Sequence, residues 1–93
     1  MPVLSPDAAR SRLAQLPGWQ IEAGELVRNF QFKDFRAALA FVNQVGELAE
    51  EAGHHPDIDI RYNRVRLALI THSAGGLTEK DFELAGKAQK LAG

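Results

Sequence analysis

Two short segments in the second half of the chain alternate between apolar and polar residues with a period of two. Residues 57–62 and residues 64–71 each carry apolar side chains at every second position. These side chains are Ile58, Ile60 and Tyr62 in the first segment and Val65, Leu67 and Leu69 in the second. Only Asn63 separates the segments, so they are expected to pair as a tight β-hairpin. Because a single face is apolar, the sheet is expected to be antiparallel and covered on that face only.

Further strands and helices are expected from the periodicity and the turn residues of the rest of the chain. Residues 19–22 and 26–32 also alternate and are joined across Ala23-Gly24, which predicts a second hairpin. The helices are expected within residues 5–18, 34–53 and 77–92. The sequence therefore predicts an α+β fold in the order α-β-β-α-β-β-α. In this fold residues 1–93 form one domain, with a four-stranded antiparallel sheet and helices packed on one face.

Two of the expected helices have well-defined apolar faces. In the last helix, the residues expected to face the core are Leu84, Ala85, Ala88 and Leu91. The helix at 34–53 has a first apolar stripe of Phe35, Ala38, Leu39, Val42, Ala49 and Ala52, and a second of Phe41, Val45 and Leu48. So wide an apolar surface fits either a deeply buried helix or contact with a second subunit in addition to the core. In the latter case, the second stripe or an open sheet edge is the expected interface.

The composition excludes several classes of function. A net charge of −1 argues against generic nucleic-acid binding, which needs a basic surface. The absence of cysteine excludes disulfides, thiolate metal sites and cysteine nucleophiles, and it fits a reducing cytosol. Neither a signal peptide nor an apolar run long enough to cross a membrane is apparent, so a cytoplasmic protein without membrane contact is expected.

The adjacent pair His54-His55 lies in an unusual local setting. Gly53 precedes the pair where a helix C-cap glycine belongs, and Pro56 favours extended geometry at His55. The pair is therefore expected in a sharp helix-to-strand turn, with its side chains diverging. Glu50, one turn before His54, is expected to hydrogen-bond an imidazole, an arrangement suited to proton transfer. The competing interpretation is that histidines in a turn are simply solvated.

A metal site built from His54, His55 and His72 is a further alternative, because imidazole is a good metal ligand. The chain has no helical His-x-x-x-His pair, which disfavours such a site. By strand parity, His72 belongs to the face opposite the apolar one, where it has no packing role.

Two polar clusters admit a structural explanation as well as a functional one. The run Thr78-Glu-Lys-Asp81 matches the pattern of a helix start, so Asp81 is expected to help cap a helix with Thr78. Arg61, Arg64 and Arg66 are interpreted as a solvated strand face, with anion binding as the weaker alternative.

Taken together, a set of spaced residues resembles the pterin-4a-carbinolamine dehydratase family. The matching residues are Glu50, His54-His55-Pro56, Tyr62, Thr71-His72, Gly75-Gly76-Leu77-Thr78 and Asp81. Residues 26–50 and the opening LPGW at residues 16–19 also resemble the family, so the similarity covers nearly the whole chain. The sequence departs from some relatives at Gly53, where they carry an acid, and at Lys80, where they carry arginine.

The resemblance implies an α+β fold with a four-stranded antiparallel sheet and assembly into homodimers or homotetramers. It implies dehydration of 4a-hydroxytetrahydrobiopterin, or a related pterin, to the quinonoid dihydropterin, which recycles the pterin of aromatic amino acid hydroxylases. The partner is then a small-molecule pterin, and no metal or organic cofactor is implied.

The resemblance also implies roles for individual residues. His54, His55 and His72 match the family's catalytic histidines, with acid–base work at His54 and His72. Glu50, His55 and Asp81 match residues that bind or support the substrate. The alternative function is a non-catalytic protein-binding or dimerisation module on the same fold.

Overall fold

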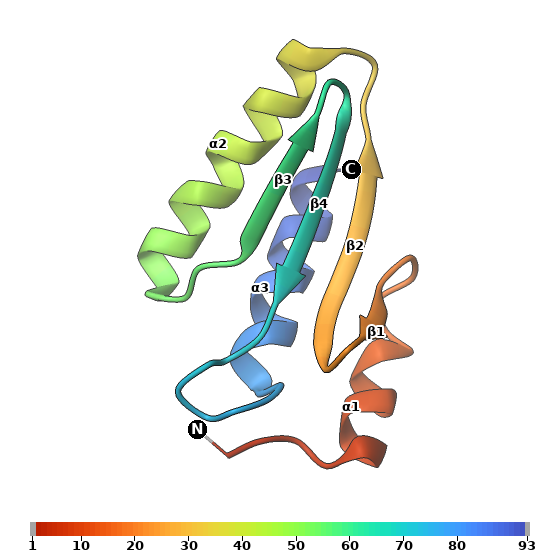
Figure 1. Cartoon of the computed structure of the whole chain (residues 1–93), viewed down its shortest axis with the longest axis vertical. Helices are drawn as coiled ribbons and strands as arrows, with labels where there is room; N and C mark the ends of the chain where they lie inside the picture. The colour runs from red at the N-terminus through yellow and green to blue at the C-terminus, as the bar shows by residue number, and fades with distance from the viewer. Residues whose placement is uncertain (1, 93) are drawn as a thin grey trace.

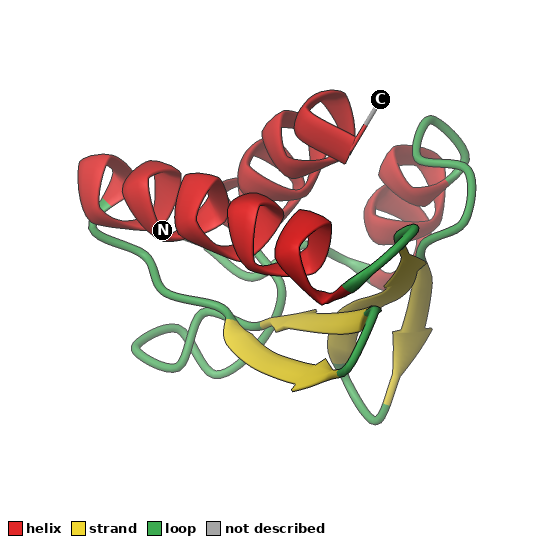
Figure 2. Ribbon diagram, turned by 90° about the horizontal axis from the view of Figure 1, so that it is seen from above, coloured by secondary structure: helices red, strands yellow, loops and turns green. Residues whose placement is uncertain are grey.

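A computed structural model describes residues 2–92, within which three helices and four strands follow the order α-β-β-α-β-β-α. The elements are α1 (Pro6–Leu13), β1 (Gln20–Glu22), β2 (Glu25–Gln31), α2 (Phe35–Ala52), β3 (Asp57–Arg61), β4 (Arg64–Leu69) and α3 (Glu79–Ala92). The strands form one antiparallel sheet in the order β1-β2-β4-β3 (Figure 1). All helices lie on the same side of this sheet (Figure 2), so the predicted fold class is confirmed. None of these helices is long and apolar enough to span a bilayer.

Both hairpins close through loops of two residues. Ala23 and Gly24 join β1 to β2 with φ angles of 50° and 80°, the left-handed values that suit a tight loop between twisted strands. Tyr62 and Asn63 join β3 to β4, and Tyr62 has a φ of 51°. The expectation that Tyr62 continues the first strand on its apolar face is therefore wrong. The strand pairing leaves two residues for the loop, and the Tyr62 side chain is 66 % exposed.

The core lies between the sheet and the helices. Val65, Leu67 and Leu69 of β4 are buried, which confirms the predicted core face of that strand. The buried apolar residues of the two long helices are Ala38, Phe41, Val45, Ala49, Phe82, Leu84, Ala85 and Ala88. Phe30 of β2 joins the two layers, because its ring lies 4.8 Å from that of Phe41 across the interface.

The residues of α2 that face the core do not follow the predicted division of this helix into two stripes. Phe41 and Val45 of the second stripe are 3 % and 0 % exposed, so the prediction that they form a subunit interface is wrong. They face the chain's own sheet, which leaves Phe35 and Leu39 of the first stripe exposed. Leu91 of α3 also departs from its prediction. It belongs to the last turn of α3, at the periphery of the core, and is 38 % exposed.

An ion pair joins α1 to the start of α3. The Arg12 guanidinium donates to both carboxylate oxygens of Glu79, at 2.8 and 2.7 Å. These hydrogen bonds lower the pKa of Glu79 below its usual range. The pair is exposed and adds little stability, but its fork geometry holds the first turn of α3 in place.

The matched substitutions Leu84→Ala and Leu91→Ala test the corrected face of α3. Leu84 is 2 % exposed, so its truncation is expected to lower the free energy of unfolding by about 2–5 kcal/mol. Truncation of the peripheral Leu91 is expected to cost about 1 kcal/mol or less. Urea unfolding measures both values, and equal losses would contradict the peripheral placement of Leu91.

Candidate functional site

A sharp turn at the end of α2 separates the two adjacent histidines. Gly53 ends the helix in the left-handed conformation, with φ 62° and ψ 31°, and its N–H donates to the Glu50 carbonyl at 3.3 Å. The His54 N–H donates to the Ala49 carbonyl at 3.1 Å. This is the glycine ending predicted from the sequence. It turns the His54 side chain inward, where it is 9 % exposed, and leaves His55 exposed, so the predicted divergence is confirmed.

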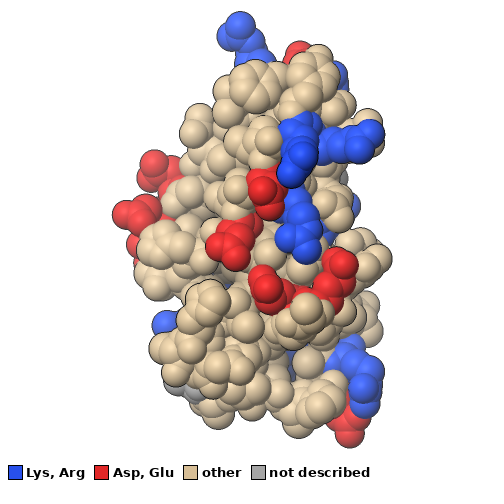
Figure 3. Space-filling view, viewed as in Figure 1, with Lys and Arg blue, Asp and Glu red and all other residues tan. Residues whose placement is uncertain are grey.

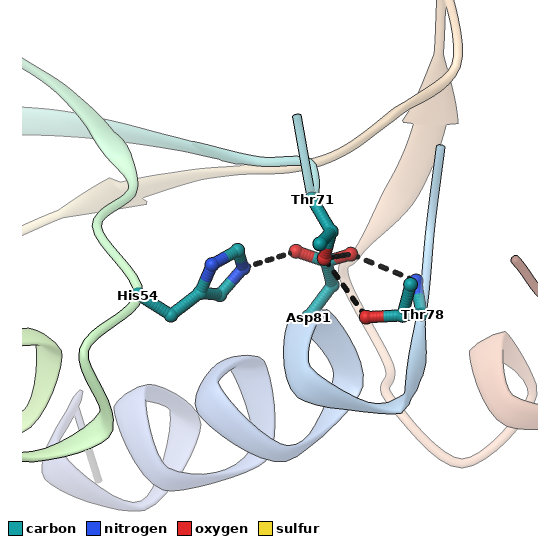
Figure 4. A network of polar contacts seen from close by, with 4 residues as sticks. All are labelled: His54, Thr71, Thr78 and Asp81. Atoms are coloured by element: carbon teal, nitrogen blue, oxygen red, sulfur yellow. Dashed lines mark hydrogen bonds and ion pairs between the residues drawn. The ribbon is translucent and has the colours of Figure 1, made fainter. Parts of the chain in front are cut away.

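The inward histidine meets a fully buried carboxylate. Asp81, in the first turn of α3, is 0 % exposed, and its Oδ1 lies 2.5 Å from His54 Nε2. Its Oδ2 accepts hydrogen bonds from the Thr71 hydroxyl and the Thr78 backbone N–H, both at 2.9 Å. Because the single hydroxyl proton of Thr71 goes to Asp81, the Thr78 hydroxyl donates to Thr71 at 2.8 Å. This network joins the turn after α2, the loop after β4 and the start of α3 (Figure 4).

Asp81 therefore has two partners of different kinds. Its bond to the Thr78 N–H confirms the predicted role at the helix start. The Thr78 hydroxyl does not complete the usual reciprocal cap, because the Asp81 backbone N–H donates to the Thr78 carbonyl at 3.1 Å. The other carboxylate oxygen is left to hold the imidazole of His54, so the cap and the histidine share one side chain.

The geometry fixes how His54 can exchange protons. An ionised Asp81 only accepts hydrogen bonds, so we assign a proton to Nε2 of His54, which then donates to Oδ1. Among the described residues, no buried side-chain nitrogen or oxygen lacks a partner. The opposite ring nitrogen of His54, Nδ1, makes no hydrogen bond within the described residues. Because every buried side-chain nitrogen there has a partner, Nδ1 is in contact with solvent. His54 is held at one nitrogen and can take up or release a proton at the other.

The outward histidine pairs with a carboxylate of α2. His55 Nε2 lies 2.5 Å from Oε2 of Glu50, and both side chains are mostly exposed. The predicted bond of Glu50 to an imidazole is present, with His55 and not His54 as the partner. Both side chains line a cavity of about 420 Å³ between α2 and the start of β3. Pro56, Ile58 and Glu47 are also part of its lining.

His72 lies apart from these two pairs. It follows Thr71 in the turn 72–75, its side chain is exposed, and it does not line the cavity beside His55. Its position next to Thr71 connects it through the backbone to the network around Asp81. The part of the chain that the structure describes brings no three His, Asp or Glu side chains into a group that could hold a metal ion. The alternative of a metal site at His54, His55 and His72 therefore has no support from the geometry.

Thr71 is the residue of this network to which the sequence analysis gave no role, although it is among the residues that match the family. It is 5 % exposed and supplies the only side-chain hydroxyl that donates to Asp81 among the residues described. A threonine at the end of a buried strand is a weak signal by itself, because β-branched residues are common in strands. Its function becomes visible only when α3 is packed against the loop after β4.

Three comparisons with known proteins agree with one another. The family model described as pterin 4 alpha carbinolamine dehydratase matches residues 2–91. A relative from Acidobacterium capsulatum, provisionally named pterin-4-alpha-carbinolamine dehydratase, is 62 % identical and covers 98 % of this chain and 99 % of its own. One from Chloroflexus aurantiacus with the same name is 60 % identical over the full length of both chains.

Solved structures extend the similarity to three dimensions. A transcriptional coactivator/pterin dehydratase from Brucella melitensis superposes with a TM-score of 0.95 at 39 % identity, covering 98 % of this chain and 99 % of that one. A pterin dehydratase-like protein described as a RuBisCO assembly factor in the alpha-carboxysome superposes with a TM-score of 0.67 at 28 % identity. That similarity covers 81 % of this chain and 87 % of the other.

Thr71→Val tests whether the buried network depends on the missed hydroxyl. The change keeps the side-chain shape but leaves Thr78 without its acceptor and Asp81 with one donor fewer, so a loss of about 1–3 kcal/mol of unfolding free energy is expected. Ser73→Ala, exposed in the same loop, is the control and should stay within about 0.5 kcal/mol of the parent. Urea unfolding compares them, and a neutral Thr71→Val would mean that Asp81 is held in another way.

Proposed function

The chain belongs to the pterin 4 alpha carbinolamine dehydratase family, and from that premise we propose that it dehydrates a 4a-hydroxytetrahydropterin to the quinonoid dihydropterin. The proposed substrate is 4a-hydroxytetrahydrobiopterin or a close relative, and the proposed role is pterin recycling for aromatic amino acid hydroxylation in the cytoplasm. The observation that carries the proposal is the His54–Asp81 pair, a histidine oriented by a buried carboxylate at the edge of the fold.

The reaction needs two proton transfers. The C4a–O bond breaks as the hydroxyl receives a proton and leaves as water, while a ring nitrogen loses a proton, so the sum is the release of one water molecule. His54 and His72 are proposed as the acid–base pair. If Nδ1 of His54 takes up a proton, the ionised Asp81 at Nε2 stabilises the imidazolium that forms. Which histidine acts as the acid depends on which side of the pterin faces each ring.

The remaining residues are proposed to bind and to position. The cavity of about 420 Å³ beside His55 has a volume within the usual range for small-molecule sites, about 300–1,000 Å³. Carboxylates of Glu50 and Glu47 in its lining are suited to accept hydrogen bonds from the amino and amide N–H groups of a pterin ring. His55, paired with Glu50, is proposed to contact the substrate there. Asp81 is fully buried with both oxygens engaged, so it is proposed to act through His54.

A second function has one observation in its favour. A structural relative at 28 % identity is described as an assembly factor, so a member of this fold can serve another protein. The alternative for this chain is a non-catalytic binding or dimerisation module. Purified protein added to enzymatically generated 4a-hydroxytetrahydropterin, followed by ultraviolet absorbance, separates the two. Acceleration of dehydration supports the enzyme, and an unchanged rate supports the module.

Substitution of the histidines tests the assigned roles. His72→Ala and His54→Ala are expected to lower kcat by about 10²–10⁴-fold, the usual contribution of a general acid or base. His55→Ala is expected mainly to raise KM. Because His72 is exposed, the His72→Ala variant should keep the thermal midpoint of the parent protein. The His54→Ala variant should have a lower thermal midpoint, because it removes a partner of the buried Asp81. Full turnover of His72→Ala, with the catalysed step rate-limiting, would remove His72 from the acid–base pair.

A homodimer or homotetramer is also proposed. The exposed Phe35 and Leu39 of α2, together with β3 at an edge of the sheet, offer surfaces for association. Sedimentation at micromolar concentration is expected to give a species of at least twice 10.2 kDa. A single species of 10.2 kDa would contradict the proposal, and Phe35→Ala and Leu39→Ala would then be expected to change nothing in the sedimentation profile.

A further inference from the structure

The face of the sheet that carries no helix has a cluster of arginines around a small cavity. The cavity has a volume of about 250 Å³ and is lined by Asn29, Asp59, Arg61, Arg64 and Arg66. Figure 3 shows basic side chains gathered over this face of the molecule, with acidic side chains beside them. The proposed dehydration uses none of these residues, because the cavity of His55 lies on the helix side of β3.

Strand register explains why the five side chains converge. Asn29 of β2 and Asp59 of β3 are the two cross-strand partners of Arg66 on the central strand β4. Arg61 and Arg64 are likewise paired directly across the β3–β4 hairpin. Residues opposite one another on adjacent strands have Cβ atoms about 4.5–5.5 Å apart, and like charges at that distance destabilise a sheet. The sequence therefore places an unfavourable pair of like charges, Arg61 and Arg64, at this hairpin.

None of the three arginines of the cluster forms an ion pair within the described residues. Within residues 2–92, the arginines that form ion pairs are Arg10 and Arg12, both outside the cluster. Asp59, the carboxylate of the cavity, forms no ion pair within 4.0 Å there either. Three arginines and one aspartate leave the cavity with a charge of +2, on a chain whose net charge is −1. The positive charge is thus local, which fits a small ligand better than a long polyanion.

We propose that this arginine cavity binds the phosphate group of a small phosphorylated metabolite that also carries a hydroxyl group. A phosphate monoester has a charge close to −2 at neutral pH, which balances the +2 of the lining. Guanidinium forks match the oxygens of a phosphate geometrically. Asp59 would repel a bare anion, so it is suited to accept a hydrogen bond from a hydroxyl of the same ligand. Asn29 can donate or accept at the other side of Arg66.

The proposed site is independent of the histidine site. Ile58 lines the cavity beside His55, whereas the next residue, Asp59, lines the arginine cavity. Successive residues of a strand point to opposite faces, so the two cavities lie on opposite sides of β3. Loss of phosphate binding would therefore leave dehydration in place, and loss of dehydration would leave phosphate binding in place.

The test is titration of the ¹⁵N-labelled full chain with ribose 5-phosphate at constant ionic strength, followed by amide chemical shifts. Saturable shifts at millimolar ligand, centred on residues 59–66, are expected. Ribose, the neutral counterpart, is expected to give none. Arg64→Gln should weaken ribose 5-phosphate binding by about 10-fold or more, because it removes a charge-assisted contact. Arg36→Gln makes the same change in charge at an exposed position of α2 and should leave binding unchanged.

Asp59→Asn tests the hydroxyl part of the inference. It should strengthen the binding of inorganic phosphate, by removing a repulsive charge, and reduce the preference for ribose 5-phosphate over inorganic phosphate. The proposal is overturned if ribose 5-phosphate gives no saturable shifts, or if sodium chloride at equal ionic strength reproduces them. Equal loss of binding in Arg36→Gln and Arg64→Gln would also overturn it, since the effect would then be one of overall charge.

Discussion

The buried carboxylate of Asp81 is the group on which the architecture around the candidate site depends. A carboxylate removed from water is strongly destabilising unless hydrogen bonds replace its hydration. Asp81 obtains them from three separate parts of the chain, the turn after α2, the loop after β4 and the start of α3. Those parts must therefore meet for Asp81 to be buried with its hydrogen bonds satisfied. The orientation of His54 follows from the same requirement, so the stability of the fold and the geometry of the candidate site are coupled through one side chain.

Strand β3 divides the molecule into two chemically different sides. It is only five residues long, yet its alternation places apolar Ile58 beside the histidine cavity and polar Asp59 beside the arginine cavity. The same period of two that predicts a one-sided core thus also keeps the cavity beside His55 apart from a cationic surface. A strand at the edge of a small sheet can serve both because only one of its faces is needed for packing.

Local signals in the sequence were sufficient for the element order, the Gly53 turn and the cap at Asp81, since each depends on residues within a few positions. They were not sufficient where two local solutions are equally apolar. Both stripes of α2 satisfy helical periodicity, and the core takes Ala38 and Ala49 from one and Phe41, which packs against Phe30, from the other. The partner of Glu50 likewise depends on the backbone angles of Gly53, and the bond from Thr71 to Asp81 spans ten residues and two elements.

The left-handed residue before His54 also has consequences for how such a site can diversify. A Cβ atom placed on Gly53 would have no heavy atom other than those of its chain neighbours within 4 Å, so the position is limited by backbone conformation and not by space for that atom. Asparagine and aspartate tolerate this conformation better than other residues that carry a side chain. A change of one amino acid can therefore introduce an acid directly beside the histidine pair without repacking the core. The turn is a point at which selection can adjust the electrostatics of the pocket while the scaffold stays the same.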